Sequence, residues 1–252
     1  MPSVILVAGG ESPVGKFGEG HQLPNKAFLD INGRPMVEYV LDAMVNSNRV
    51  DNIILIGPYE ELSRFSSKVD QIIEDKGSLI DNIRAGIRSL PGDTLAIIST
   101  TDIPLITSQI IDDFIERSIE EKAEICYPII NKKYFEEKYP GMQRTSVRVK
   151  EGVYIGGNMM LVNTSLIDKF ADIVEKTIKY RKSMWQLARL VGLGCLLKFL
   201  TKTLTIADVE RRVSSIFGCE VAAIDMPYPE IGVDVDKPTD LRYVRRMLKG
   251  RC

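Results

Sequence analysis

Continuous apolar runs separated by helical patterns constrain the fold of this chain more than any other feature. Residues 4–8, 53–56 and 95–98 are uninterrupted apolar segments of four or five residues. Such runs are typical of strands that are buried on both faces of a parallel sheet. Between and after them, apolar side chains recur at helical spacing, over residues 35–44, 78–90 and 107–119. This alternation predicts an α/β fold with a mostly parallel twisted sheet flanked by helices.

The rhythm changes after residue 124. Residues 127–154 mix short extended segments with loops, and a short strand is also expected earlier, at 69–73. Further strands are predicted at 158–162 and 220–224, and a helix over 238–248 closes the chain. Residues 165–218 have an almost wholly helical pattern. We therefore predict a single domain over residues 1–252, with 165–218 as a helical insertion within it.

Composition excludes several classes of protein. The chain is 44% apolar and 27% charged with a net charge of −1, so it is an ordinary globular protein, and no nucleic-acid partner is expected. Its four cysteines form no CxxC and its only histidine is His21, which argues against a zinc site or a disulfide framework. The first residues lack the pattern of a signal peptide, so a cytoplasmic location is expected.

No transmembrane segment is expected, because the longest apolar stretch, residues 184–200, contains charges and glycines. Packing of this stretch within the protein is the first interpretation. The sequence also allows peripheral membrane contact through residues 184–200, or a homodimer interface there.

The long loop from Gly9 to Lys26 follows the first predicted strand, where ligands bind in parallel sheets. Its first half fits G-x-x-x-x-G-K, but Phe17 stands where a P-loop needs Ser or Thr to hold Mg²⁺. Glycines and a proline then oppose the helix that a P-loop requires. Backbone amides and two lysines, Lys16 and Lys26, remain, and they suit a polyphosphate. The alternative is an ordinary surface loop rich in turn residues.

Four segments together resemble the MobA-like nucleotidyltransferases, which include molybdenum-cofactor guanylyl- and cytidylyltransferases and sugar-phosphate nucleotidylyltransferases. The opening strand and glycines are followed by LPNKAFLDINGRPMV over residues 23–37, which is similar to the family's start. KGSLIDNIRAG over 76–86 and TDIPLI over 101–106 resemble later motifs, as does GVDVDKPTDL over 232–241. Four motifs in the right order are more specific than any one of them.

This resemblance implies a GT-A-like fold and a magnesium-dependent nucleotidyltransferase. It implies that Lys26 and Asp102 are catalytic, that Asp102 binds Mg²⁺ and that Asp236 is its second carboxylate. On a strand, Asp234 would share a face with Asp236, so it is held in reserve, and the alternative for the pair is an exposed polar edge. The alternative for Asp102 is a hydrogen bond to the turn that follows it. The predicted nucleotide-binding residues are Ala8, Gly9, Gly10, Lys16, Lys26, Ser78, Asn82 and Thr101.

The chain departs from the family pattern in the glycine loop. Where the family has G-G-x-G-x-R, this chain has Ser12 in place of the third glycine and Val14 in place of the arginine. Lys16 is the candidate for the missing cation. Ser78 has a second interpretation as a simple helix cap.

The acceptor is expected to bind at Gly156, Gly157 and Asn158, where two glycines allow close approach to the backbone. Arg144 is expected to add a phosphate contact, and the alternative for this segment is a turn before a strand. The predicted reaction transfers NMP from an NTP, CTP or GTP, to a small phosphorylated acceptor and releases pyrophosphate. Alternatives are a GT-A glycosyltransferase that uses a nucleotide sugar, against which the missing D-x-D at residues 100–102 counts, and a non-catalytic nucleotide-binding protein.

Overall fold

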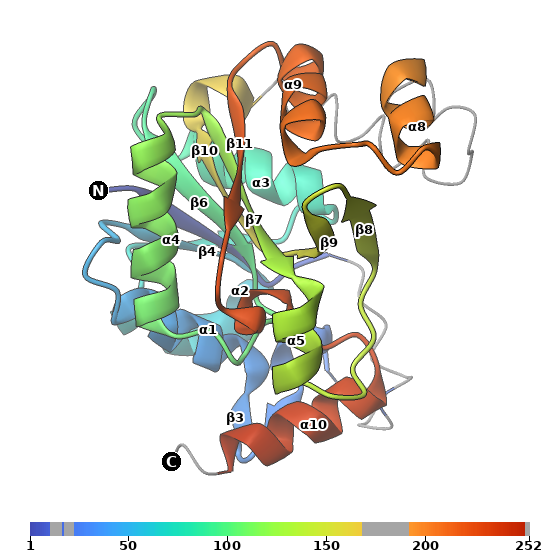
Figure 1. Ribbon diagram of the computed structural model, residues 1–252. Coiled ribbons are helices and arrows are strands. Elements are labelled where there is room, and N and C mark those ends of the chain that lie inside the picture. Colours follow the sequence, from blue (N-terminus) through green and yellow to red (C-terminus); the bar gives the residue numbers. More distant parts are fainter. Residues whose placement is uncertain (11–16, 18–22, 168–191, 250–252) are drawn as a thin grey trace.

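A central sheet organises the molecule (Figure 1). The computed structural model describes residues 1–10, 17, 23–167 and 192–249. Among them, strands of one sheet follow the order β5-β4-β1-β6-β10-β7-β9-β8, and β11 also pairs with β7. Its strands are β1 (Ser3–Val7), β4 (Ile53–Gly57), β5 (Gln71–Glu74), β6 (Leu95–Thr100), β7 (Ile125–Asn131), β8 (Ser146–Val149), β9 (Gly152–Gly156), β10 (Met159–Asn163) and β11 (Val221–Asp225). A separate small hairpin joins β2 (Asp30–Ile31) and β3 (Arg34–Pro35).

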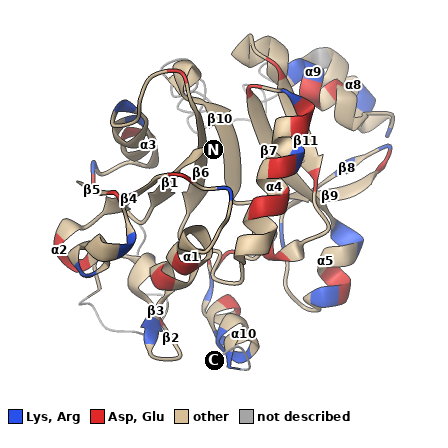
Figure 2. Ribbon diagram, turned by 90° about the vertical axis from the view of Figure 1, so that its left-hand side faces the viewer, with Lys and Arg blue, Asp and Glu red and all other residues tan. Residues whose placement is uncertain are grey.

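Helices cover both faces of the sheet. The α-helices are α1 (Met36–Val45), α2 (Tyr59–Leu62), α3 (Leu79–Arg88), α4 (Ser108–Glu121), α5 (Lys132–Lys138), α8 (Leu193–Leu200), α9 (Ile206–Phe217) and α10 (Pro238–Leu248). Short 3₁₀ helices lie at η2 (Lys26–Phe28), η3 (Ser63–Lys68), η4 (Thr164–Leu166) and η5 (Pro229–Gly232). The outer face of α4 carries acidic residues and α10 carries basic ones (Figure 2).

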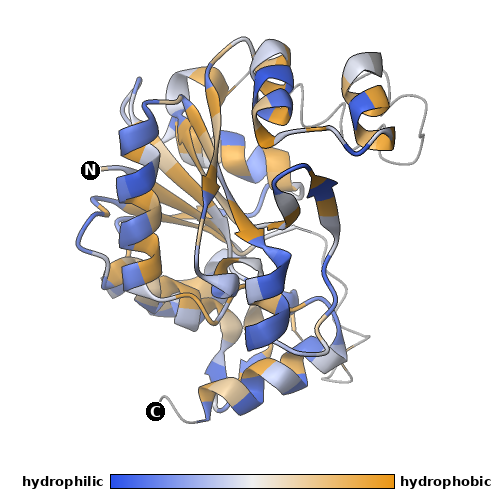
Figure 3. Ribbon diagram, viewed as in Figure 1, coloured by the Kyte–Doolittle hydropathy of each residue, from blue (hydrophilic) through white to orange (hydrophobic). Residues whose placement is uncertain are grey.

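The continuous apolar runs form strands because both of their faces are buried. In β1, Val4 and Leu6 pack with α1 and α4 on one face, while Ile5 and Val7 pack with α3 on the other. Every residue of β1 and of β4 is buried. The apolar strands lie between helices whose polar sides face outward (Figure 3). The predicted fold class, α/β with helices flanking a mostly parallel sheet, is confirmed.

The sheet has a parallel half and a mixed half. β5, β4, β1 and β6 are parallel, whereas β10 runs antiparallel to both β6 and β7. From β1 the chain moves to β4 and β5 on one side, then returns to place β6 on the other side of β1. This reversal makes the β1–β6 boundary a topological switch point, where ligands bind beyond the carboxyl ends of the strands.

Local signals placed most elements, but helices α2 and α5 and the β2–β3 hairpin were not predicted. Thr107 caps α4, and Ser78 caps α3 in agreement with its second interpretation; each side-chain oxygen accepts from a backbone amide of the first turn. The third strand is β5, which ends one residue later than expected. The loop-rich interpretation of residues 127–154 was wrong where β7 passes directly into helix α5, whose polar, charged sequence has only Phe135 buried.

The predicted insertion is described in part. Within 165–218 the structure describes α8 and α9, and the remaining apolar residues singled out there, 185–191, lie outside the described residues. Lys16 also lies outside them. No described helix has the length and apolar character needed to cross a membrane.

Candidate active site

Two strand ends meet at the switch point. Gly9 and Gly10 follow β1, and Asp102 lies two residues beyond β6. These three residues border a cavity of about 470 Å³. Of the predicted nucleotide-binding residues within the described chain, the cavity is lined by Ala8, Gly9, Gly10, Lys26, Ser78 and Thr101.

Asn25 determines where Lys26 points. Its Oδ1 accepts from the amide of Ala27 at 2.9 Å and so caps the short helix η2 that begins at Lys26. Its Nδ2 donates to the carbonyl of Ala8 at 2.7 Å, which ties the helix to the end of β1. Asn25 is buried, so it has no competition from water for these bonds. Lys26 is thereby fixed at the edge of the cavity.

Lys26 bridges two of the predicted catalytic and metal-binding carboxylates. Its Nζ lies 2.6 Å from Asp102 Oδ2 and 2.8 Å from Asp236 Oδ1, although Asp236 is 210 residues away in the sequence. Burial disfavours the charged amine, but the two carboxylates outweigh it and raise the pKa of Lys26 above its ordinary value. The lysine is therefore a fixed cation at the end of β6.

Asp234 completes a cluster of three carboxylates. Oxygens of Asp102, Asp234 and Asp236 lie within 4.8 Å of one another. Burial, together with the negative charge of Asp102 and Asp236, raises the pKa of Asp234 to about 6, while Arg144 opposes the shift. Mg²⁺ prefers hard oxygen ligands, and it usually takes one or two carboxylates together with substrate phosphates. These donors fit a magnesium ion.

Arg144 forms an ion pair with Asp234 of this cluster. Its Nε lies 2.7 Å from Asp234 Oδ1 and donates to the carbonyl of Gly232 at 3.0 Å, and its Nη2 donates to the carbonyl of Asp234. Asp240 accepts from the amides of Asp236 and Lys237 at 3.1 and 3.0 Å, and so stabilises the start of α10. The structure thus engages Arg144 in positioning Asp234, in addition to lining a cavity.

Asp75 was missed by the sequence analysis. Its carboxylate accepts from the amide of Gly10 at 2.8 Å, from Asn82 Nδ2 at 2.9 Å and from the amide of Gly77 at 2.9 Å. Although burial opposes ionisation, these donors hold the pKa of Asp75 below its ordinary value. Asn82, a predicted nucleotide-binding residue, is fully buried and does not line the cavity. Its side chain is engaged by Asp75 instead. An aspartate at the end of a third parallel strand was the available signal.

A larger cavity of about 1080 Å³ adjoins the carboxylate cluster. It is lined by all four predicted acceptor-binding residues, Arg144, Gly156, Gly157 and Asn158, together with Asp234 and Asp236. A Cβ atom at Gly157 would lie 2.4 Å from Ile231 Cγ2 and 2.9 Å from Pro128 Cγ, so a side chain there would displace these two side chains. The two cavities meet where Lys26 joins Asp102 to Asp236.

The fold and this site define the class. A solved structure of a hypothetical transferase from Thermus thermophilus is 33% identical, with a TM-score of 0.83, and the match covers 96% of this chain and 100% of that one. A CMP:2-keto-3-deoxy-manno-octonic acid synthetase complexed with CTP shares the fold at 14% identity, with a TM-score of 0.66 over 100% and 99% of the two chains. The chain has the GT-A-like α/β fold of nucleotidyltransferases. More specifically, it belongs to the MobA-like NTP transferase domain family, whose model matches residues 4–190.

Curated relatives carry two kinds of name. The 2-C-methyl-D-erythritol 4-phosphate cytidylyltransferase of Clostridium botulinum is 28% identical over 131 residues, which are 49% of this chain and 56% of that protein. The probable molybdenum cofactor guanylyltransferase of Thermococcus sibiricus is 21% identical over 160 residues, 61% and 77% of the two chains. The chain spans about half the length of the cytidylyltransferases that it matches, 46% to 56% of each.

Proposed function

We propose that the chain transfers the nucleotidyl group of a nucleoside triphosphate to a small phosphorylated acceptor and releases pyrophosphate. The observation that carries the proposal is the Lys26–Asp102–Asp236 bridge, which lies between a glycine-lined cavity and a second cavity. One cavity accounts for the donor and the other for the acceptor. Relatives named as cytidylyl- and guanylyltransferases support CTP or GTP as the donor.

In the proposed reaction an acceptor phosphate oxygen attacks the α-phosphorus of the triphosphate. A new P–O bond forms while the bond from the α-phosphorus to the oxygen bridging to the β-phosphate breaks, and that electron pair leaves with pyrophosphate. An acceptor phosphate is ionised at neutral pH, so no general base is needed. Lys26 and the amides of the glycine loop stabilise the charge that develops on the transferred phosphoryl oxygens.

Asp102, Asp234 and Asp236 would hold Mg²⁺, which when bound supplies electrophilic stabilisation of phosphoryl oxygens. Without such a cation, three clustered carboxylates would repel both phosphorylated substrates. Lys26 and Arg144 compensate this charge only in part, since two cations face three acidic side chains.

The proposal is tested by a pyrophosphate-release screen of four triphosphates against phosphorylated sugars, alcohols and pterins, with Mg²⁺ present. We expect pyrophosphate with CTP or GTP and one class of acceptor. Release of free nucleoside diphosphate from a nucleotide sugar would instead identify a glycosyltransferase. Tight binding of a triphosphate with no turnover of any acceptor would identify a nucleotide-binding protein without this activity.

A further inference from the structure

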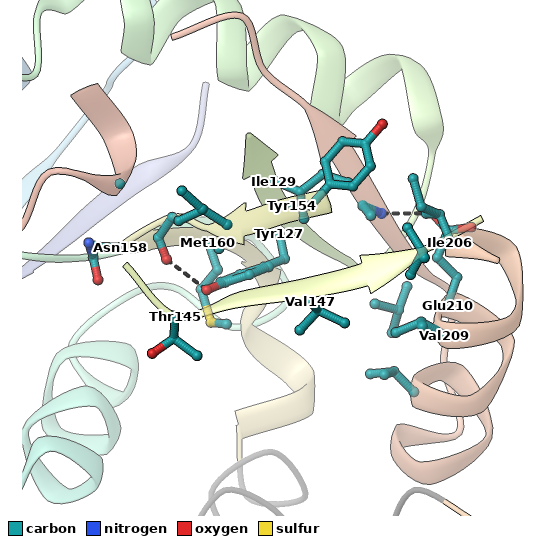
Figure 4. A pocket seen from close by; sticks show the side chains of 18 of the residues that line it. Tyr127, Ile129, Thr145, Val147, Tyr154, Asn158, Met160, Ile206, Val209 and Glu210 are labelled. Carbon is teal, nitrogen blue, oxygen red and sulfur yellow. Dashed lines mark hydrogen bonds between the residues drawn. The ribbon is translucent and has the colours of Figure 1, made fainter. Parts of the chain in front are cut away.

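The larger cavity has two chemically different ends. Near the carboxylates it is bordered by Asn158, Asp234 and Asp236. Away from them it runs between the sheet and α9, and here its walls are apolar. The sheet contributes Tyr127, Val147 and Met160, and the helix contributes Val209, Val213 and Ile216. Figure 4 shows several of these side chains along the sheet and the helix.

The described chain covers the apolar side of helix α9 only in part. Its apolar residues 206, 209, 213, 216 and 217 recur at helical spacing, as they would on a helix that packs against a core. None of them is buried, and Asp208 is the buried residue of this helix. Helix α4, on the other face of the same sheet, buries Ile110, Ile111 and Phe114. α9 therefore stands off from the sheet along part of its length.

The sheet wall opposite α9 is equally exposed. Val147 is 50% exposed and Tyr127 is 36% exposed, although both are large apolar side chains on strands. Burying such surface is favourable in proportion to its area, so the paired walls favour an apolar occupant. Polar groups at this end have partners within the protein. The carboxylate of Glu210 accepts from the amide of Ala223 at 2.8 Å.

Tyr127 connects the apolar end to the reaction site. Its hydroxyl donates to the carbonyl of Gly157 at 2.7 Å, so its ring lies along the cavity beside the predicted acceptor segment (Figure 4). A Cβ atom at Gly156 would lie 2.5 Å from this hydroxyl. A molecule whose head lies at the carboxylates can therefore continue past Gly156 and Tyr127 into the apolar space.

We propose that the acceptor is an amphiphile, with a phosphate that lies at Asp234 and Asp236 and an apolar body that lies between the sheet and α9. This inference rests on the proposed function for the role of the phosphate, but the apolar walls stand independently of it. The volume of about 1080 Å³ exceeds what a small polar phosphoester needs. A purely polar acceptor would leave the apolar walls facing water.

The test compares two alkyl phosphates with the same head group. Binding of octyl phosphate and of methyl phosphate to the full chain is measured by calorimetry with Mg²⁺ present. Each methylene that leaves water adds a similar increment of free energy, so we expect octyl phosphate to bind at least about 100-fold more tightly. Equal affinities for the two esters would overturn the inference.

Two variants test where the alkyl group of octyl phosphate binds. Val209→Asn on α9 and Val147→Asn on β8 each place a neutral amide in the cavity wall, and each should weaken octyl phosphate binding by about 10-fold while leaving methyl phosphate unaffected. Val45→Asn is the matched control, because Val45 is 42% exposed on α1 while Val209 is 38% exposed on α9. The inference fails if the control lowers affinity as much as the cavity variants do.

Turnover separates this inference from the proposed function. Pyrophosphate release with alkyl phosphates that increases with chain length supports both. Chain-length-dependent binding without pyrophosphate from any acceptor would contradict the proposed function alone. Release that is faster with polar phosphates, and that Val209→Asn leaves unchanged, would contradict the amphiphile alone.

Discussion

The donor cavity and the acceptor cavity differ in how closely the side chains around them are packed. At the donor cavity, every residue of β1 and β4 is buried, and hydrogen bonds to Asn25 and Asp75 hold Ala8 and Gly10 in place. At the acceptor cavity, α9 and the facing strands leave apolar side chains exposed. A closely packed donor site suits one constant group, the triphosphate. An incompletely filled acceptor site suits a part of the substrate that varies among relatives.

The largest expected effect is the loss of Asp102, which lies at the junction of the two cavities. Asp102→Ala removes one of the two carboxylates held by Lys26 and one of the three proposed cation ligands, so kcat should fall by about 10³-fold or more. Asp51→Ala, an exposed aspartate at the opposite end of the sheet, is the control and should keep full activity. Circular dichroism should show both variants folded. Full activity of Asp102→Ala would contradict the assignment of Asp102 as a metal ligand.

Replacing Arg144 tests whether Asp234, at the acceptor cavity, depends on this arginine for its position. Because its guanidinium is 11% exposed and paired with Asp234, Arg144→Ala should lower the free energy of unfolding by about 3 kcal/mol. It should also weaken Mg²⁺ binding, which calorimetry measures. Arg148→Ala changes an exposed arginine of β8 and should do neither. If Arg144→Ala raises only the KM of the acceptor, the arginine contacts substrate instead of positioning Asp234.

Gly9 tests how tightly the donor cavity is built. A Cβ atom there would lie 2.7 Å from the carboxylate of Asp75 and 2.9 Å from Asn82 Nδ2. Gly9→Ala should displace Asp75 from the Gly10 amide and raise the KM of the triphosphate about 10-fold. Gly92→Ala has no neighbouring atom within 4 Å at its Cβ position and should leave KM unchanged. Steady-state kinetics with varied triphosphate distinguishes the two.

The smallest expected effect is at Ser78. Its Oγ accepts from the amide of Asp81 at 3.1 Å and caps α3, so Ser78→Ala should lower stability by about 1 kcal/mol. If capping is its whole role, the KM of the triphosphate stays within about twofold. A rise well beyond that would assign Ser78 a direct contact with the nucleotide. Denaturant unfolding and kinetics on the same sample measure both quantities.

Sequence reasoning succeeded where a local pattern carries the information. Buried apolar runs placed the parallel strands, and the strand ends placed Gly9, Lys26 and Asp102 on one rim. It failed where the partner is distant and no family motif marks both residues. The ion pair of Arg144 with Asp234 joins residues 90 apart, and Asp75 engages Gly10 across 65 residues. Neither spacing leaves a periodic signal.

The sequence also could not predict that the apolar side of α9 is only partly covered. A helix that packs against a core and a helix that borders a cavity show the same apolar periodicity. The difference lies in how far the helix stands from the sheet, and only the fold sets this distance. The same limitation explains why helix α5 was not predicted. Its sequence is charged, and its one buried residue, Phe135, packs in a cluster with residues from a distant part of the chain.

The central claim is that the α-phosphorus is the atom transferred, and labelled triphosphate tests it directly. With CTP or GTP labelled at the α-phosphate, an acceptor from the screen and Mg²⁺, the account predicts label in the acceptor product. With label at the γ-phosphate, it predicts all released label in pyrophosphate. Transfer of the γ-label to the acceptor, or its release as inorganic phosphate, would contradict the account.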